Sequence, residues 1–155
     1  MTRNVLLFLA VFFVALLSGA SFAVGLDNNF AGMSPTFFVE KMQHSIRMLT
    51  VPLPAVAILG VFFTVASAIF ARRDRLMFYS LTAASICVIA GAMITVFGNV
   101  PINNQIVTWS VNAPPSNWTE LGEKWRLFHT IRTILTTAGL SFLILATLVR
   151  RDASR

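Results

Sequence analysis

Four long apolar segments, separated by polar stretches, set the pattern of the chain. They cover residues 5–24, 53–71, 76–97 and 131–149. Each is close to the roughly 20 residues that a helix needs to cross the hydrocarbon core of a bilayer. Because the segments fill most of the 155 residues, the pattern predicts an all-α protein: a four-helix transmembrane bundle that forms one integral membrane domain over residues 1–155.

The first apolar segment has a second interpretation. Arg3, the apolar stretch and the small residues of Ser21-Phe-Ala23 resemble a secretory signal peptide with its cleavage site. The apolar run is longer than the roughly 7–15 residues of a typical signal-peptide core. We therefore expect the segment to be retained as a membrane-spanning helix.

Charge predicts the orientation of the bundle. The composition is 56% hydrophobic and 12% charged, with a formal net charge of +6. Arginines gather at the N-terminus, between the second and third segments, and in the tail, as Arg3, Arg72, Arg73, Arg75, Arg150, Arg151 and Arg155. By the positive-inside rule, these parts and both termini are cytoplasmic, most simply in a plasma (inner) membrane. We expect this charge to meet anionic lipid and no nucleic acid, because the arginines lie in short tethers without interleaved aromatics.

The outward connection over residues 26–52 contains an amphipathic helix. Ser34-Pro35 is a favourable helix start. After it, apolar and polar positions alternate with helical spacing, so that Phe38, Met42, Ile46 and Leu49 share one side and Glu40, Gln43, His44 and Arg47 the other. This extracytoplasmic helix either lies on the membrane surface or runs into the second span through a kink at Pro52 and Pro54. In the second case its polar side faces the bundle interior.

A short motif occurs twice and contains both histidines. His44-Ser-Ile-Arg47 and His129-Thr-Ile-Arg132 each stand just before an apolar span. Those two spans run in the same direction, so the motifs should lie at similar depth and meet in a polar pocket that opens outward. Ionisable groups at the edge of a bilayer are costly and are functional by default.

Side-chain amides add further candidate ligand contacts. Asn99, Asn103 and Gln105 flank Pro101 in a stretch for which we expect a non-helical turn at the end of the third span. Amides in such a turn can bind a ligand carbonyl. The predicted substrate-binding set is therefore Asn99, Asn103, Gln105, Gln43, His44, Arg47 and Phe128.

These residues also support a resemblance. Asn99-Val-Pro-Ile-Asn103, followed by Trp125-x-x-Phe-His129-x-x-Arg132 before the last span, resembles the small four-helix membrane proteins grouped with the fungal anthrone oxygenases. Met42-Gln43-x-x-Ile46 is similar to that family's pattern too. The resemblance implies cofactor-independent oxygenation of an anthrone to an anthraquinone. In characterised members a histidine and a tryptophan beside the last span are thought to matter, and His129 and Trp125 match them. The first connection departs from the pattern, because residues 26–34 lack the expected proline, which bears on the substrate more than on the fold.

The chemistry of the residues fits such a reaction. A neutral histidine is a suitable base near pH 7 for a carbon acid, and the resulting carbanion can reduce dioxygen without a cofactor. We predict that His129 is the base, that Arg132 or Arg47 stabilises the enolate oxygen, and that Trp125 and Phe128 form a flat wall for an anthrone- or quinone-like aromatic. The structural alternative places Trp109, Trp118 and Trp125 in an aromatic belt at the membrane interface.

Three further alternatives stay open at this point. Glu40, His44 and His129 form a two-histidine, one-carboxylate set of the kind that binds iron, and two facing histidines can instead hold a haem. Cys87 is the single cysteine, which excludes an internal disulfide. The protein can also be a non-enzymatic subunit of a larger membrane complex or a homo-oligomer, with close helix contacts through small residues such as Gly19, Ala20, Ala83, Ala84, Gly91 and Ala92.

Overall fold

A computed structural model describes residues 2–28, 30 and 32–152. Four helices in this part are long and apolar enough to cross a membrane, which confirms the predicted all-α transmembrane bundle. The elements in chain order are α1 (Thr2–Asp27), α2 (Pro35–Leu49), α3 (Pro52–Phe70), α4 (Arg75–Ile94), the π-helical turn η1 (Thr95–Asn99), α5 (Val100–Ile106) and α6 (Trp118–Asp152).

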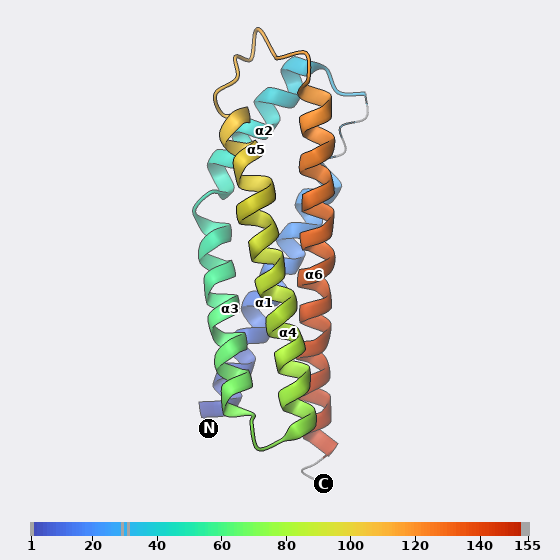
Figure 1. Cartoon of the computed structure of the whole chain (residues 1–155). Coiled ribbons are helices and arrows are strands. Elements are labelled where there is room, and N and C mark those ends of the chain that lie inside the picture. The colour runs from blue at the N-terminus through green and yellow to red at the C-terminus, as the bar shows by residue number, and fades with distance from the viewer. Residues whose placement is uncertain (1, 29, 31, 153–155) are drawn as a thin grey trace.

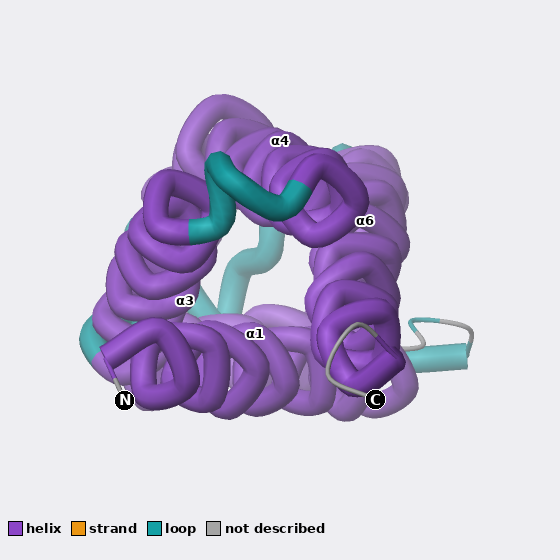
Figure 2. Tube along the Cα trace, turned by 90° about the horizontal axis from the view of Figure 1, so that it is seen from below, coloured by secondary structure: helices purple, strands orange, loops and turns teal. Residues whose placement is uncertain are grey.

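The four long helices form a four-sided bundle. Figure 2 shows them around the axis in the order α1, α3, α4 and α6. The most extensive contacts join α4 to α6 and α1 to α3. Small residues bring α4 and α6 close together: a Cβ atom on Gly139 would lie 2.7 Å from Val88 Cγ2, and one on Gly91 would lie 3.2 Å from Thr136 Cγ2. These two glycines therefore serve contacts within the chain.

Helix α1 packs as a full member of the bundle. Leu7, Ala10 and Val14 are buried in the core shared with α3, α4 and α6. Higher up, the hydroxyl groups of Ser18 and Thr137 are hydrogen-bonded at 2.9 Å. In the described chain α1 therefore forms one of the four sides of the bundle.

Helix α2 covers the upper end of the bundle (Figure 1). Its start is as expected, since Ser34 Oγ accepts a hydrogen bond from the Phe37 amide. It ends at Leu49, before α3 begins, so the two are separate helices. Its apolar side contacts protein, because Phe38 and Met42 are buried in an upper core with α5, α6 and the loop between them. Gln43, which the periodicity placed on the polar side, is buried with them.

The expectation of a non-helical turn after the third span is wrong. The chain continues from α4 through η1 into α5, and the Val100 amide donates to Thr95 O in the π-helical pattern. In a regular α-helix the ring of Pro101 would clash with the carbonyl four residues earlier. The wide turn directly before Pro101 relieves this clash, so helical geometry persists to Ile106.

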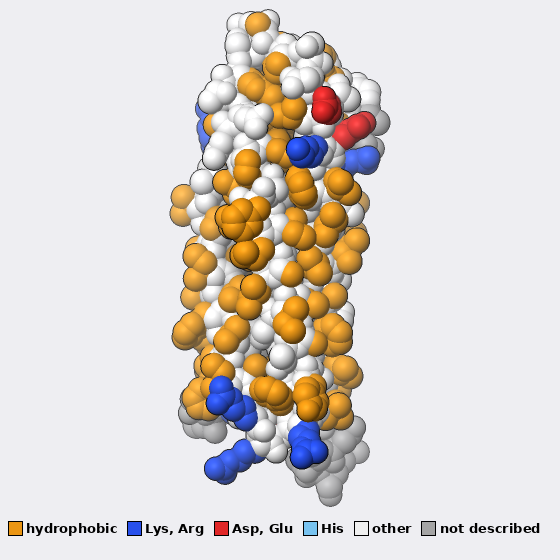
Figure 3. Space-filling model, in the orientation of Figure 1, with side chains coloured by type: hydrophobic (Ala, Val, Ile, Leu, Met, Phe, Trp, Pro, Cys, Tyr) orange, Lys and Arg blue, Asp and Glu red, His pale blue; other side chains and the backbone are white. Residues whose placement is uncertain are grey.

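Charged residues differ between the two ends of the bundle. The N-terminal end of α1, the α3–α4 connection and the end of α6 lie together at the lower end (Figure 1). Figure 3 shows basic side chains there and both acidic and basic side chains near the upper end. Between the two ends the visible surface is dominated by hydrophobic side chains, as expected for a segment surrounded by lipid.

Candidate functional site

A cavity of about 800 Å³ begins in the upper part of the bundle and continues downward along α3 as far as Ile69. Helices α1, α2, α3, α4 and α6 all contribute to its wall, together with η1 and α5. Its size is within the range of small-molecule sites. The polar side chains on the wall are Asn28, Ser45, Thr50, Asn99, Asn103, Asn104, Arg132, Thr95 and Thr136.

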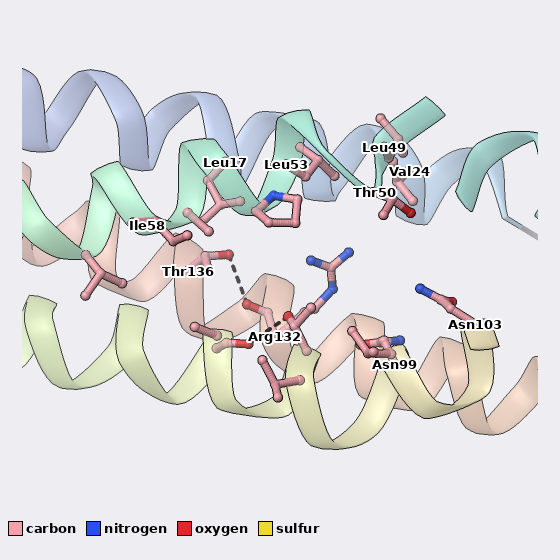
Figure 4. Close-up of a pocket in the computed structure, with 18 of the residues that line it drawn as sticks. Leu17, Val24, Leu49, Thr50, Leu53, Ile58, Asn99, Asn103, Arg132 and Thr136 are labelled. Carbon is pink, nitrogen blue, oxygen red and sulfur yellow. Dashed lines mark hydrogen bonds between the residues drawn. The ribbon is translucent and has the colours of Figure 1, made fainter. Parts of the chain in front are cut away.

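Arg132 places a cation on this wall. Figure 4 shows its side chain extending from α6 into the cavity, between Thr50 and Leu53 on one side and Asn99 on the other. Its Nη2 donates a hydrogen bond of 2.9 Å to Nδ1 of His129. Its Nε is buried and has no hydrogen-bond partner among the described residues. The guanidinium therefore has donor capacity left for a ligand.

His129 lies directly behind this arginine. Its side chain is 1% exposed, and it is not on the cavity wall. A guanidinium can only donate hydrogen bonds, so Nδ1 must accept. Nε2 then carries the hydrogen and donates to the carbonyl oxygen of Ser21 on α1, at 2.8 Å. The contacts thus define a neutral imidazole with its one lone pair directed at Arg132.

Trp125 completes the group on α6. Its ring stacks on the imidazole of His129, with centroids 4.7 Å apart and an interplanar angle of 14°. The indole Nε1 donates to Asn103 Oδ1 at 2.8 Å, and Asn99 Nδ2 donates to the backbone oxygen of Trp125 at 3.0 Å. Two of the predicted ligand-binding amides therefore hold the tryptophan in place. The remaining oxygen, Asn99 Oδ1, is buried without a partner among the described residues.

Asn28 is a part of the site that sequence reasoning missed. It follows directly after α1, is 2% exposed and lines the cavity. Its Nδ2 donates to Val24 O, and its Oδ1 is buried without a partner in the described part of the chain. Buried polar atoms in native structures are normally satisfied. Asn28 Oδ1, Asn99 Oδ1 and Arg132 Nε together therefore indicate a polar site for a ligand or for water.

Five of the seven predicted binding residues, Gln43 among them, are not on the cavity wall. His44 and Arg47 are exposed on α2 and Gln105 is exposed on α5, and none of the three is on the cavity wall. Phe128 packs against η1, where a Cβ atom on Gly98 would lie 2.6 Å from its Cγ.

Gln43 has its hydrogen-bonding groups engaged within the protein. Its Nε2 donates to Ile106 O and Trp109 O, both at 2.9 Å, and its Oε1 accepts from Arg47 at 3.2 Å. The two repeated motifs thus border the same cavity, one through Arg132 and the other through Ser45 and Ile46, while neither histidine is on its wall.

The residues of the alternative metal site do not come together. Glu40 and His44 are exposed, whereas His129 is buried. Within residues 2–28, 30 and 32–152 no group of three or more His, Cys, Asp or Glu side chains could hold a metal ion. Both ring nitrogens of His129 are engaged in hydrogen bonds within the protein.

The fold and the site define a small four-helix membrane protein with an arginine at an internal cavity and a buried histidine bonded to it. The family model described as anthrone oxygenase matches residues 42–142. Since this is more than half of the sequence, the chain belongs to the anthrone oxygenase family. No curated protein and no solved structure matches the chain. The matched region contains Asn99, Trp125, His129 and Arg132, but α1, with Ser21, precedes it.

Proposed function

We propose that the chain is a cofactor-independent oxygenase that acts on an anthrone-like aromatic bound beside Arg132. The observation that carries this proposal is the Arg132–His129 pair: a cation on the cavity wall with the lone pair of a neutral imidazole directly behind it. We further propose that the arginine-bearing lower end faces the cytoplasm, as the positive-inside rule predicts.

The reaction balances without an external reductant. The base removes one proton from the CH₂ group of the anthrone, and the carbanion is delocalised into the ring carbonyl as an enolate. Electron transfer to dioxygen and formation of a C–O bond give a hydroperoxide. Loss of the second C–H proton and cleavage of the O–O bond then give the second ketone and one molecule of water. One anthrone and one dioxygen thus become one anthraquinone and one water.

The arginine and the histidine have complementary roles in the first step. When the guanidinium of Arg132 turns to the carbonyl oxygen of the substrate, the lone pair of His129 Nδ1 is released to accept the proton. A preorganised cation at the oxygen that becomes negative stabilises the transition state. The imidazolium that forms keeps its Nε2 hydrogen bond to Ser21 O. Burial in an apolar bundle strengthens each of these interactions.

Trp125 has two roles in the proposed reaction, one toward His129 and one toward the substrate. It lies on the wall and stacks on His129, so its ring fixes the plane of the imidazole and offers a flat apolar surface to an aromatic substrate. Asn103 and Asn99 keep it in that orientation.

Oxygen uptake and anthraquinone formation by the purified protein in lipid nanodiscs, with anthrone as substrate, test the proposal. Losing a positioned base typically costs about 10²–10⁴-fold in rate, so His129→Ala should lose activity by that factor. His44→Ala should change the rate far less, because that side chain is exposed and away from the cavity. Labelled dioxygen should appear in the new ketone, and a chelator should leave the rate unchanged.

Retention of fold is checked by circular dichroism and by gel filtration in detergent. Full activity of folded His129→Ala would remove the histidine from the reaction. Equal losses in His44→Ala and His129→Ala, together with bound iron, would support the bis-histidine alternative instead.

A further inference from the structure

The cavity has two chemically different parts. The polar groups already described, Asn28, Asn99, Asn103 and Arg132, belong to its upper part. Below them an arm follows α3, and every α3 side chain on its wall is apolar: Ala57, Ile58, Val61, Phe62, Val65, Ala66 and Ile69. We refer to this lower part as the α3 arm.

Two hydroxyl groups on the opposite wall do not change the apolar character of the α3 arm. Thr95 Oγ1 donates to Gly91 O at 2.9 Å, and Thr136 Oγ1 donates to Arg132 O at 2.9 Å. Both donors are thus used within their own helices. A ligand that fills the whole cavity therefore needs a polar group at one end and a hydrocarbon portion at the other.

The cavity is too long for a three-ring aromatic alone. From Leu53 to Ile69, both on its wall, α3 rises roughly 24 Å at about 1.5 Å per residue. Three fused rings cover about two helical turns, or roughly 11 Å. A head group in contact with Arg132 would leave the lower half of the α3 arm to a further part of the ligand.

The α3 arm opens sideways between α3 and α4. Ile58, Phe62 and Val96 line the cavity and are also 68%, 60% and 53% exposed. No side-chain hydrogen bond or ion pair joins α3 to α4 in the part of the chain that the structure describes. The opposite side, between α1 and α6, is closed by the Ser18–Thr137 and Ser21–His129 hydrogen bonds. Since these helices cross the bilayer, the opening faces acyl chains.

We propose that the ligand of this cavity is an amphiphile with an oxygenated aromatic or quinone head at Arg132 and a long aliphatic tail along α3, loaded sideways from the bilayer. The proposal rests on the proposed function only for the position of the head group. The observation that supports it is one continuous cavity that is polar at one end, apolar along α3 and open to lipid. The tail takes the place of lipid chains in the α3 arm while the head satisfies the unpaired polar atoms above it.

Photo-crosslinking with tails of different length tests this placement. Two 1,4-naphthoquinone probes are added to the protein in nanodiscs. Each carries a diazirine at the end of its tail, which has three carbons in the short probe and the length of an isoprenoid chain in the long probe. The short probe should label α3 near Leu53 and Ile58, whereas the long probe should label it near Ala66 and Ile69. Excess phylloquinone should lower the crosslinking yield of each probe by at least four-fifths. Labels that do not move with tail length, or that persist under competition, would overturn the proposal.

A matched pair of tryptophan substitutions tests the tail site independently of the crosslinked positions. Ala66→Trp fills the α3 arm, whereas Ala55→Trp is on the same helix at an exposed position away from the cavity. Ala66→Trp should lower specific labelling by the long probe at least fivefold and leave the short probe unchanged, and Ala55→Trp should affect neither. Equal effects of Ala66→Trp on both probes would contradict a tail site. Specific labelling without oxygenation of anthrone would instead refute only the oxygenase function.

Discussion

Two hydrogen bonds define the chemical state of His129, and one of them crosses the bundle. Spacing along one helix predicts that His129, Arg132 and Trp125 are neighbours, and the structure places them together. The bond from Nε2 to Ser21 O could not be predicted, because its partners are 108 residues apart and the acceptor is a backbone atom. Asn28 was missed for a similar reason: one polar residue after an apolar run carries no periodic signal, and its burial depends on tertiary packing.

Gly98 offers a test of packing at the level of one residue. A Cβ atom there would lie 2.6 Å from Cγ and 2.9 Å from two further ring atoms of Phe128. Overpacking of this kind typically costs about 1–3 kcal/mol, so Gly98→Ala should lower the thermal unfolding midpoint in detergent. Gly19→Ala is the matched control, because a Cβ atom there would meet nothing within 4 Å. A higher midpoint for Gly98→Ala than for Gly19→Ala would show that Phe128 has room to move.

Individual helices differ in how well the apolar pattern predicts them. The four spans follow from hydrophobic length alone, because a chain in lipid must satisfy its backbone groups internally. The helical path through η1 and α5 does not follow from the sequence pattern, because Pro101 and the surrounding amides have the local composition of a turn. Contacts with the rest of the protein override that preference: Ile102 and Ile106 are buried against α2, and Asn99 and Asn103 are bonded to Trp125.

Gln43 connects helix α2 to α5 and the loop after it through hydrogen bonds. Its Nε2 bonds to both Ile106 O and Trp109 O, and Gln43→Leu would leave those two carbonyl groups without this donor. Loss of a buried partner costs about 1–3 kcal/mol, so the variant should unfold at a lower denaturant concentration. Hydrogen exchange should also rise in residues 35–49. Gln105→Leu is the control because Gln105 is exposed, and similar destabilisation by both changes would remove the special role of Gln43.

The bundle as a whole has a lower end marked by basic side chains (Figure 3), and the polar part of the cavity lies toward its upper end. The charge pattern predicted the arginine-rich end and the repeated motifs predicted a pocket at the other end, and both ends of the described chain lie at the lower end (Figure 1). The sequence did not predict the tail-like extension of the cavity. That extension depends on how α3 packs against the other helices, which no pattern within one helix determines.

Labelling with a membrane-impermeant maleimide tests the orientation. In a Cys87→Ala background, Ser116→Cys should react in intact cells, because Ser116 is exposed at the upper end. Asp74→Cys should react only after permeabilisation, since it stands among Arg72, Arg73 and Arg75, which the positive-inside rule places in the cytoplasm. The reverse pattern would invert the bundle and open the site to the cytoplasm.

The bond between Ser21 and His129 also ties the candidate site to the first helix. A chain cleaved after Ala23 would keep three spans and every residue of the matched family region, yet Ser21 would be gone. Arg132 would still donate to Nδ1, but the hydrogen on Nε2 would have lost its acceptor and the imidazole its contact with the first helix. Processing at the N-terminus would thus remove the contact that holds the imidazole from across the bundle, while every residue of the matched family region stayed in the membrane.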